Sequence, residues 1–228
     1  MAKLVPVSLS ERAYVKIKKM ISDYRFSPGS RLNVDKLARD LGTSRTPIWE
    51  AVRRLEQERL VKNIPNRGVF LVELTHEAAI ELYTVREVLE GMAARLAVDR
   101  ISDKALEKME KMLREQEKIV AEEDLVAYSK SDFDFHACIY AACGNTILRE
   151  MLESIKQKAR PIAMHITPIL TDLLHDHEMI VHALRLRDPL LAEVAFREHN
   201  QRVLRQLHAE DLDGRIRHTN IPPKGRKP

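Results

Sequence analysis

The chain has 228 residues, of which 44% are apolar and 32% are charged. This length accommodates one large domain or two modest ones, and the balance of apolar and charged residues excludes a disordered chain. Only 7 glycines and 5% aromatic residues argue against a β-sandwich or a β-barrel.

Two further features favour a cytoplasmic protein. No apolar run approaches the roughly 18 residues that span a bilayer, and residues 1–10 lack the pattern of a signal peptide, so we expect no membrane partner. Cys138 and Cys143 lie five residues apart in one predicted helix, which points their side chains apart. We therefore expect no disulfide framework and a reducing compartment.

The net charge of +4 is unevenly distributed along the chain. Residues 1–73 contain 15 Lys and Arg against 8 Asp and Glu, a net charge of +7. Residues 74–213 contain 18 against 26, a net charge of −8, and residues 214–228 contain 5 against none. A basic segment joined to an acidic one indicates a polyanion-binding module attached to a second domain.

Residues 1–73 predict three helices followed by a β-hairpin. The predicted helices cover residues 10–22, about 33–40 and about 44–58, and the predicted strands cover 60–64 and 69–72. Ser10 is the expected N-cap of the first helix, Gly42 ends the second, and Pro47 lies in the first turn of the third. Three helices and a hairpin in this order predict a winged helix-turn-helix, a DNA-binding domain.

From residue 74 to residue 213 every segment predicts helix. The six predicted helices cover about residues 75–100, 102–120, 125–142, 146–166, 168–187 and 188–210. Their short connections indicate an all-α antiparallel bundle, with Pro161 kinking the fourth helix. The basic tail, residues 214–228, has no apolar periodicity and is expected to be disordered.

The third predicted helix has the features of a DNA-recognition helix. Its first turn presents hydroxyls and a guanidinium, and Arg45 can hold O6 and N7 of guanine with its planar fork. Arg53 is better placed for phosphate charge than for bases. The residues expected to contact DNA are Ser44, Arg45, Thr46, Trp49 and Arg53 in this helix, with Asn66, Arg67 and Gly68 in the hairpin turn.

The segment of residues 1–73 resembles the DNA-binding domain of the GntR family of bacterial transcription regulators. The resemblance rests on Pro28-Gly29, Leu37-Ala38, Leu41-Gly42, Ser44-Arg45-Thr46-Pro47, Glu50-Ala51-Val52, Leu55, Leu60-Val61 and Pro65-Asn66-Arg67-Gly68. Trp49 departs from the pattern, since the family commonly has a DNA-contacting arginine there, and Asp35 stands where some members place a basic residue. The resemblance implies DNA binding by a dimer on a pseudo-palindromic operator.

Four residues of the predicted bundle are candidate metal ligands. Asp132 and His136 are four residues apart on one helix and share a face, whereas His177 and His199 lie in the fifth and sixth helices. Spacing alone leaves two interpretations open: a divalent-cation site inside the bundle, or packed and solvated side chains.

The bundle resembles the FadR-type effector domain of GntR regulators, the FCD branch. The shared motifs are Tyr83-Thr84-Val85-Arg86, Glu90, Asp132-Phe133-Asp134-Phe135-His136, Gly144-Asn145, His177-Glu178-Met179-Ile180, Ala183-Leu184, Asp188 and Arg197-Glu198-His199. The resemblance implies that Asp132, His136, His177 and His199 bind a divalent metal ion of the Zn, Ni or Mn class. It also implies that Arg86 binds the carboxylate of a small effector, with Asn145 supporting the pocket.

The function expected from the two resemblances is a homodimeric, metabolite-responsive repressor of transcription. A metal-dependent hydrolase with a DNA-binding domain is the alternative, because a metal with open positions can activate water. The remaining candidate histidines, His165, His175, His182 and His208, match no position of the pattern and are expected to be packing or surface residues.

Overall fold

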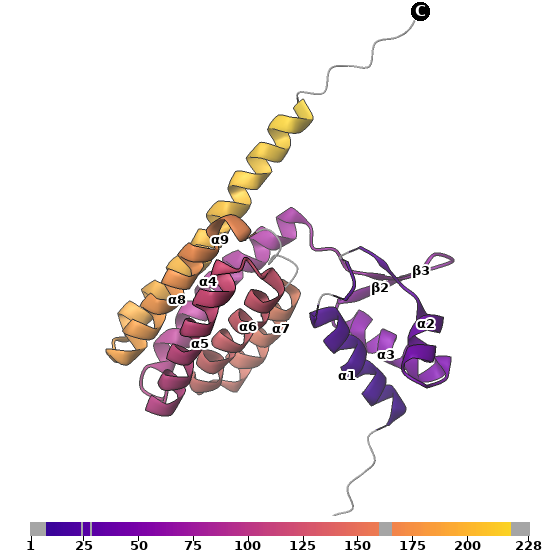
Figure 1. Ribbon diagram of the computed structural model, residues 1–228, viewed down its shortest axis with the longest axis horizontal. Coiled ribbons are helices and arrows are strands. Elements are labelled where there is room, and N and C mark those ends of the chain that lie inside the picture. The colour runs from indigo at the N-terminus through magenta and orange to yellow at the C-terminus, as the bar shows by residue number, and fades with distance from the viewer. Residues whose placement is uncertain (1–7, 24, 28, 160–165, 220–228) are drawn as a thin grey trace, which may run out of the picture. The chain divides into compact units, whose positions relative to one another are not determined.

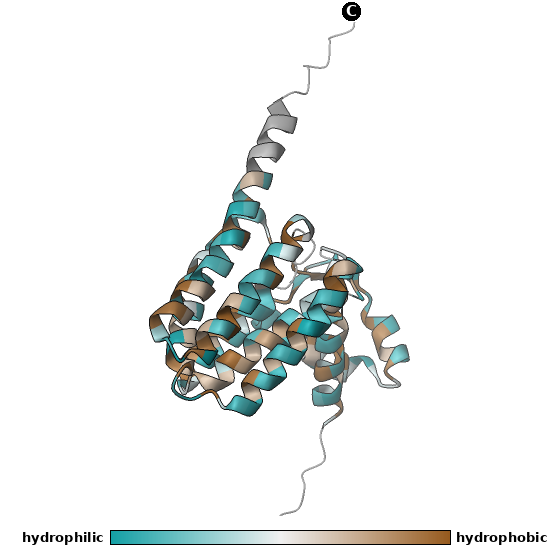
Figure 2. Cartoon of the chain, turned by 60° about the vertical axis from the view of Figure 1, so that its left-hand side comes forward, coloured by the Kyte–Doolittle hydropathy of each residue, from teal (hydrophilic) through white to brown (hydrophobic). Residues whose placement is uncertain are grey.

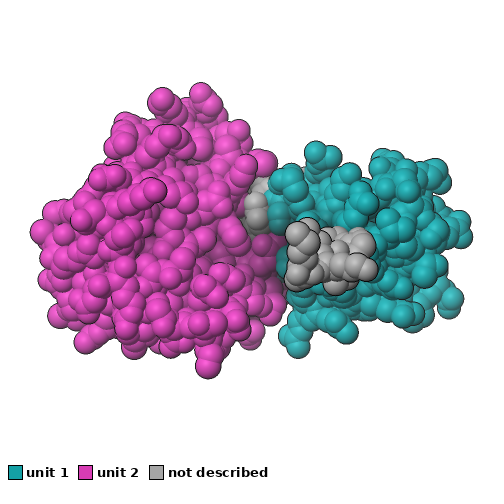
Figure 3. Space-filling view, turned by 90° about the horizontal axis from the view of Figure 1, so that it is seen from below, with its two compact units in different colours: residues 1–74 teal, residues 75–228 magenta. Residues whose placement is uncertain are grey.

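The computed structural model describes residues 8–23, 25–27, 29–159 and 166–219, with backbone only for residues 167 and 211–219. The chain divides into two compact units, Met1–Leu74 and Thr75–Pro228, which Figure 3 shows in different colours. Pro28, the kink expected at Pro161, and His165 lie outside the described residues.

The first unit is a winged helix-turn-helix, as the sequence predicts (Figure 1). Its elements are α1 (Leu9–Ser22), β1 (Arg31–Leu32), α2 (Val34–Asp40), α3 (Arg45–Gln57), β2 (Val61–Ile64) and β3 (Gly68–Leu71). The strands form an antiparallel sheet in the order β1-β3-β2, with Leu32 opposite Val69 and Asn63 also opposite Val69. The predicted hairpin is therefore part of a three-stranded sheet.

Two helix starts in the first unit differ from the predictions by one or two residues. Ser8 rather than Ser10 caps α1, because the Ser8 hydroxyl accepts a hydrogen bond from the Glu11 amide at 3.1 Å. Asn33 caps α2 through the Lys36 amide at 2.9 Å. A side-chain acceptor at the N-cap satisfies an amide that the helix itself leaves unpaired.

The core of the first unit lies between α1, α3 and the sheet. Ile17, Ile48, Ala51 and Leu55 are fully buried and follow the helical period that the sequence shows. Leu32, Val61 and Val69 close the same cluster from the three strands. This packing holds α3 in the unit by its buried face and leaves its opposite face exposed.

The conformation of the turn between β2 and β3 is determined by Pro65, Asn66 and Gly68. The Arg67 amide donates to the Ile64 carbonyl at 3.0 Å, with Pro65 and Asn66 at the central positions. Asn66 has a φ of 61°, and a positive φ after proline is the signature of a type II turn. Gly68 follows with a φ of 102°, a conformation that favours glycine.

The second unit is an all-α bundle, also as the sequence predicts. Its helices are α4 (His76–Ala97), α5 (Asp103–Ala121), α6 (Leu125–Ala142), α7 (Thr146–Ala159), the 3₁₀ turn η2 (Thr167–Ile169), α8 (Leu170–Arg185) and α9 (Pro189–Thr219). The last helix extends beyond the expected end near Glu210 and includes residues 214–219, which the sequence assigns to an irregular tail. A single glycine costs a helix about 1 kcal/mol relative to alanine, so Gly214 alone does not end it.

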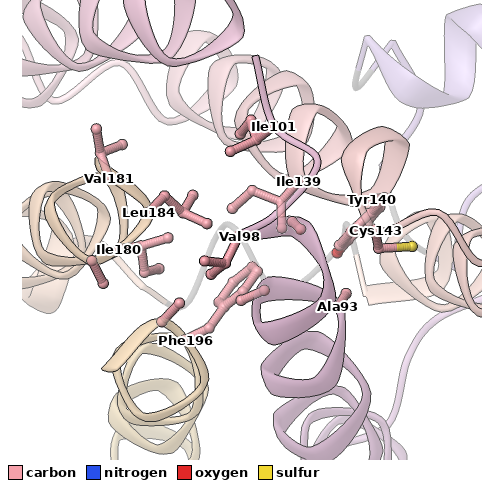
Figure 4. Packing of buried hydrophobic residues seen from close by; sticks show 14 of the residues in the cluster. Ala93, Val98, Ile101, Ile139, Tyr140, Cys143, Ile180, Val181, Leu184 and Phe196 are labelled. Atoms are coloured by element: carbon pink, nitrogen blue, oxygen red, sulfur yellow. The ribbon is translucent and has the colours of Figure 1, made fainter. Parts of the chain in front are cut away.

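The bundle core is built from one face of each helix. Hydrophobic and hydrophilic residues alternate along the helices (Figure 2), and Phe196, Val98 and Leu184 point into one cluster from α9, the end of α4 and α8 (Figure 4). Across the described part of the chain, no helix is long and apolar enough to cross a bilayer. Beside this apolar core, several polar side chains are also buried, and they form the site described next.

Candidate metal centre and DNA-reading face

The exposed face of α3 carries the predicted DNA-contacting residues. Arg45, Thr46, Trp49 and Arg53 are exposed and lie on the side opposite the buried Ile48 and Val52. Ser44 occupies the N-cap position, and its side chain makes no capping hydrogen bond. An exposed helix N-terminus with hydroxyls and a guanidinium suits phosphate oxygens and base edges.

Arg45 forms an ion pair in the absence of DNA. Its Nε lies 2.6 Å from Oδ1 of Asp35, which is in the first turn of α2. Both side chains are largely exposed, so solvent screens the pair. Asp35 therefore holds the guanidinium beside the start of the recognition helix.

The tip of the wing presents Asn66 and Arg67 to solvent. Gly68 has a structural role there, since a Cβ at this position would lie 2.9 Å from Nε of Arg31. Its positive φ adds backbone strain for any other residue. We therefore assign Gly68 to the shape of the wing, whereas Asn66 and Arg67 remain available for contact.

The four candidate metal ligands come together inside the second unit. Asp132 and His136 lie on α6, His177 on α8 and His199 on α9, and one potential ligand atom of each lies within 4.8 Å of the others. The three histidines are buried and Asp132 is mostly buried. Oδ1 of Asp132 lies 3.2 Å from Nε2 of His136 and 3.5 Å from Nε2 of His177.

Hydrogen bonds on the far side of two imidazole rings fix their tautomers. Nδ1 of His136 donates to Oε1 of Glu90 at 2.9 Å, and Nδ1 of His177 donates to Oε1 of Gln116 at 2.9 Å. In the neutral ring the proton is then on Nδ1, so Nε2 is left as a lone-pair donor. Metal-binding histidines commonly have such a partner on the second nitrogen.

The buried atoms of the cluster fit a divalent cation. Nε2 of His136 and Nε2 of His177 are fully buried and have no hydrogen-bond partner among the described residues. Leaving two polar atoms unsatisfied is costly unless something coordinates them. Three imidazole nitrogens and one carboxylate oxygen are a donor set that Zn²⁺ and similar ions accept in a four-coordinate or open site.

The ionisation states in the cluster favour metal binding at neutral pH. Burial lowers the pKa of His177, and burial together with the neighbouring imidazoles of His177 and His136 lowers the pKa of His199 well below its usual value. Burial opposes the charge of Asp132, but Lys156 and His136 outweigh it and hold its pKa well below the usual range. The site therefore offers His177 and His199 as neutral imidazoles beside the ionised carboxylate of Asp132.

Arg86 and Glu90 form a fully buried ion pair next to this cluster. Nη2 of Arg86 lies 3.0 Å from Oε1 of Glu90, one turn along α4. Glu90 also accepts from the Tyr140 hydroxyl and from Nδ2 of Asn200 at 2.6 Å. Burial opposes the charge of both groups, but the attraction between the two opposite charges is larger. The pKa of Glu90 therefore lies well below its usual value, and the pKa of Arg86 lies above its usual value.

A pocket adjoins the cluster on the side of Arg86. The residues that line it include Tyr83, Arg86, Ser129, Asp132, Lys156 and Ile166. Nζ of Lys156, on α7, lies 2.6 Å from Oδ2 of Asp132. Burial lowers the pKa of Lys156 to about 8, although Asp132 partly offsets this effect, so the ammonium is mostly charged at pH 7. The pocket thus joins the predicted effector residue, Arg86, to one of the predicted metal ligands, Asp132.

Asn145, which the resemblance implies as a support of the pocket, has a structural contact at the start of α7. Its side chain is exposed, and its Oδ1 accepts from the Leu148 amide at 3.0 Å. This is an N-cap interaction at the start of α7, and Asn145 is not among the residues that line the pocket. His175, His182 and His208 are exposed, in agreement with the surface role expected for them.

Sequence reasoning did not assign three residues of the site: Glu90, Gln116 and Lys156. The position of Glu90 could have been recognised from the sequence, because it follows Arg86 by four residues on a helix and can form an ion pair with it. Lys156 could also have been recognised, since it continues the buried series Leu148 and Leu152 at the same spacing. Gln116 contacts His177 across 61 residues of sequence, and no local pattern reports that contact.

The comparisons with known proteins agree for both units. The FCD domain family matches residues 81–202, and the family of bacterial regulatory proteins called gntR matches residues 9–71. The HTH-type transcriptional regulator YdhC of Bacillus subtilis (strain 168) is 33% identical over 146 residues, which are 62% of this chain and 64% of that protein. A probable D-xylose utilization operon transcriptional repressor of Paenarthrobacter nicotinovorans is 29% identical, over 78% of this chain and 80% of its own length.

The fold has a close match among solved structures. E. coli McbR/YncC has a TM-score of 0.79 at 24% identity, covering 90% of this chain and 99% of that one. The relatives are transcriptional regulators, so the metal-dependent hydrolase considered from the sequence is not supported. The chain belongs to the GntR family of bacterial regulatory proteins, in its FCD branch, and is a DNA-binding transcriptional regulator rather than an enzyme.

Proposed function

We propose that this regulator is a homodimeric repressor that senses a small organic acid at a metal-containing pocket. In this proposal residues 1–73 bind a pseudo-palindromic operator, and residues 74–213 bind the metal and the acid and form the dimer. One relative is named a probable repressor, which supports repression over activation. Because it acts on chromosomal DNA, the protein would work in the cytoplasm.

The observation that carries the proposal is the convergence of Asp132, His136, His177 and His199 on one point of the bundle. Their ligand atoms come from three helices, and two of the imidazoles already have their second nitrogen held by Glu90 and Gln116. A bound divalent ion would supply a positive centre able to coordinate an oxygen of an organic acid. The side chains of this protein would hold that ion and orient the acid.

Arg86 is the residue we propose as the anchor of the effector carboxylate. It lines the same pocket as Asp132, and a planar guanidinium suits a carboxylate. Glu90 holds the guanidinium in place at 3.0 Å, so the anchor is oriented before the acid arrives. The acid can change DNA binding only if it binds one arrangement of the bundle more tightly than another.

Exposed apolar residues on α4 and α9 support a dimer. Val85, Val88 and Met92 form a stripe along one face of α4, and Leu190 and Val194 are exposed on α9. The two helices pack against each other, so these residues can belong to one surface. A homodimer would cover this surface and would present two recognition helices to two half-sites.

Elemental analysis of protein purified without an affinity tag tests the metal centre. We expect about one divalent ion per chain in the wild type and in His175→Ala, whose histidine is exposed two residues from the site. His177→Ala removes one of four ligands and should lose most of the metal. Equal metal content in His177→Ala and His175→Ala would show that the four-ligand site is wrong.

A further inference from the structure

The pocket beside the proposed metal centre contains a second buried cation, Lys156, to which the proposed function gives no role. Its side chain is 7% exposed, and it lies on the face of α7 that also buries Leu152 and Ala159. Burying an ammonium is costly, so such a lysine needs a counter-charge. Within the described residues, the carboxylate of Asp132 provides it at 2.6 Å.

Asp132 uses its two oxygens in two directions. Oδ1 lies near Nε2 of His136 and Nε2 of His177, whereas Oδ2 faces Lys156. A metal ion held by the three histidines would therefore share this carboxylate with the ammonium. The negative charge of Asp132 would then be shared between the ion and Lys156, so it would no longer fully neutralise the ammonium of Lys156.

Among the described residues, the charges around the pocket balance without a metal ion. Arg86 is balanced by Glu90, and Lys156 is balanced by Asp132. Asp176, a buried carboxylate near His199, is held by Arg202 through two hydrogen bonds of 2.7 and 2.9 Å. A divalent ion bound by Asp132 and three neutral imidazoles would leave two uncompensated positive charges at a site shielded from water.

We propose that the pocket selects a compact dicarboxylate, and that Lys156 is the residue that recognises the second carboxylate. This inference rests on the proposed metal centre and adds the charge of the ligand to it. A dianion would cancel the two excess charges, whereas a monocarboxylate would leave one. The free space in the pocket is about 20 Å³, room for the centre of about one water molecule, so even a compact diacid must displace side chains to enter.

Calorimetric titration of the full chain loaded with one equivalent of Zn²⁺ tests the proposal. The probes are malonate, succinate and glutarate, each compared with its half-amide, which has nearly the same shape and one charge fewer. The best diacid is expected to bind at least about tenfold more tightly than its half-amide, the size of one charge-assisted contact. Lys156→Met should reduce this ratio to about twofold or less, and Lys156→Arg should retain part of it.

Lys158→Met is the matched control, because Lys158 lies two residues along the same helix and is not among the pocket residues. It should keep the full preference for the diacid. Zinc content is measured for every variant in the same experiment. If the wild type binds no zinc, the proposed function is wrong. If zinc binds and no diacid exceeds its half-amide, or if Lys156→Met keeps the preference, the assignment of Lys156 is wrong and the metal centre stands.

Discussion

Oε1 of Glu90 lies 2.9 Å from Nδ1 of His136, and this contact determines which nitrogen of that imidazole faces Asp132. The same oxygen lies 3.0 Å from Nη2 of Arg86. One buried carboxylate therefore holds both a proposed metal ligand and the proposed effector anchor. A change at Glu90 should affect the stability of the bundle and the affinity of the metal together.

Glu90→Gln should destabilise the bundle by about 3–5 kcal/mol, because it leaves the buried Arg86 without its charged partner. The loss is measured by urea unfolding. The double variant Arg86→Met/Glu90→Gln should recover a large part of it, since neither charge then remains unpaired. In the single variant, metal affinity should also fall by about 10–100-fold. Unchanged stability in Glu90→Gln would contradict the ion pair.

Arg45→Lys should separate the reading of bases from the attraction to phosphate. The lysine keeps the charge and loses the planar fork, so fluorescence anisotropy should show a loss of about 1–3 kcal/mol on the operator and little change on random DNA. Arg53→Ala serves as the comparison, because a phosphate contact should weaken binding to both DNAs alike. Equal losses on both DNAs for Arg45→Lys would assign Arg45 to the phosphate backbone.

Asn145→Ala should lower stability without changing the response to organic acids. The side chain caps α7 through the Leu148 amide, and loss of an N-cap costs about 0.5–2 kcal/mol. Thermal unfolding measures the loss, and titration of the metal-loaded protein with succinate measures the response. Asn145→Asp keeps the capping oxygen and should remain near wild type. A weaker response to the acid with normal stability would return Asn145 to the effector site.

Val88→Asp should weaken the dimer while leaving the fold intact. Val88 lies in the middle of the exposed stripe on α4, so a charge there opposes burial against a second copy. Sedimentation velocity at several concentrations should show a shift towards monomer, and circular dichroism should be unchanged. Val126→Asp, at an exposed valine on α6, is the control. A monomeric wild type, or a fully dimeric Val88→Asp, would place the dimer contact elsewhere.

The stability of the first unit should depend on pH through Glu58. Burial opposes its charge, but hydrogen bonds from Lys18 and Tyr14 outweigh it and lower the pKa of Glu58 from its ordinary value of 4.5. The stabilisation is therefore complete above that value and is lost as the pH falls through the lowered pKa of the folded state.

We expect Glu58→Gln to be less stable than the wild type at pH 7 and the difference to shrink in acid below about pH 4. Urea unfolding followed by the fluorescence of Trp49, the only tryptophan of the chain, reports on this unit. Glu50→Gln, at an exposed position of α3, is the control. A difference between Glu58→Gln and the wild type that stays constant down to pH 3 would exclude this role of Glu58.

The fold was largely predictable because its elements carry local signals. The apolar spacing in α3 and the cap at Thr75 predict helices that the structure contains. The strand β1 has only two residues, Arg31–Leu32, too few for an alternating pattern, and its pairing with β3 depends on residues about 40 positions away. The extension of α9 past Gly214 was missed because residues 214–219 have no apolar periodicity that would predict a helix.

The candidate site was predictable only in part, because some of its contacts join residues that are far apart in the sequence. Asp132 and His136 are neighbours on one helix face, so spacing indicated half of the ligand set. The family resemblance, not the spacing, added His177 and His199. The roles of Gln116 and Lys156 depend on distances across the bundle, and a polar residue on a buried helix face is the only local signal that such contacts leave in a sequence.

The two faces of α3 separate folding from recognition. Ile48, Ala51 and Leu55 hold the helix in the unit, and the side chains on the opposite face make few contacts that the fold requires. Substitutions on the outer face can therefore accumulate without unfolding the protein. A change on this face, where Trp49 lies, can therefore alter which DNA the helix binds and leave the fold as it is.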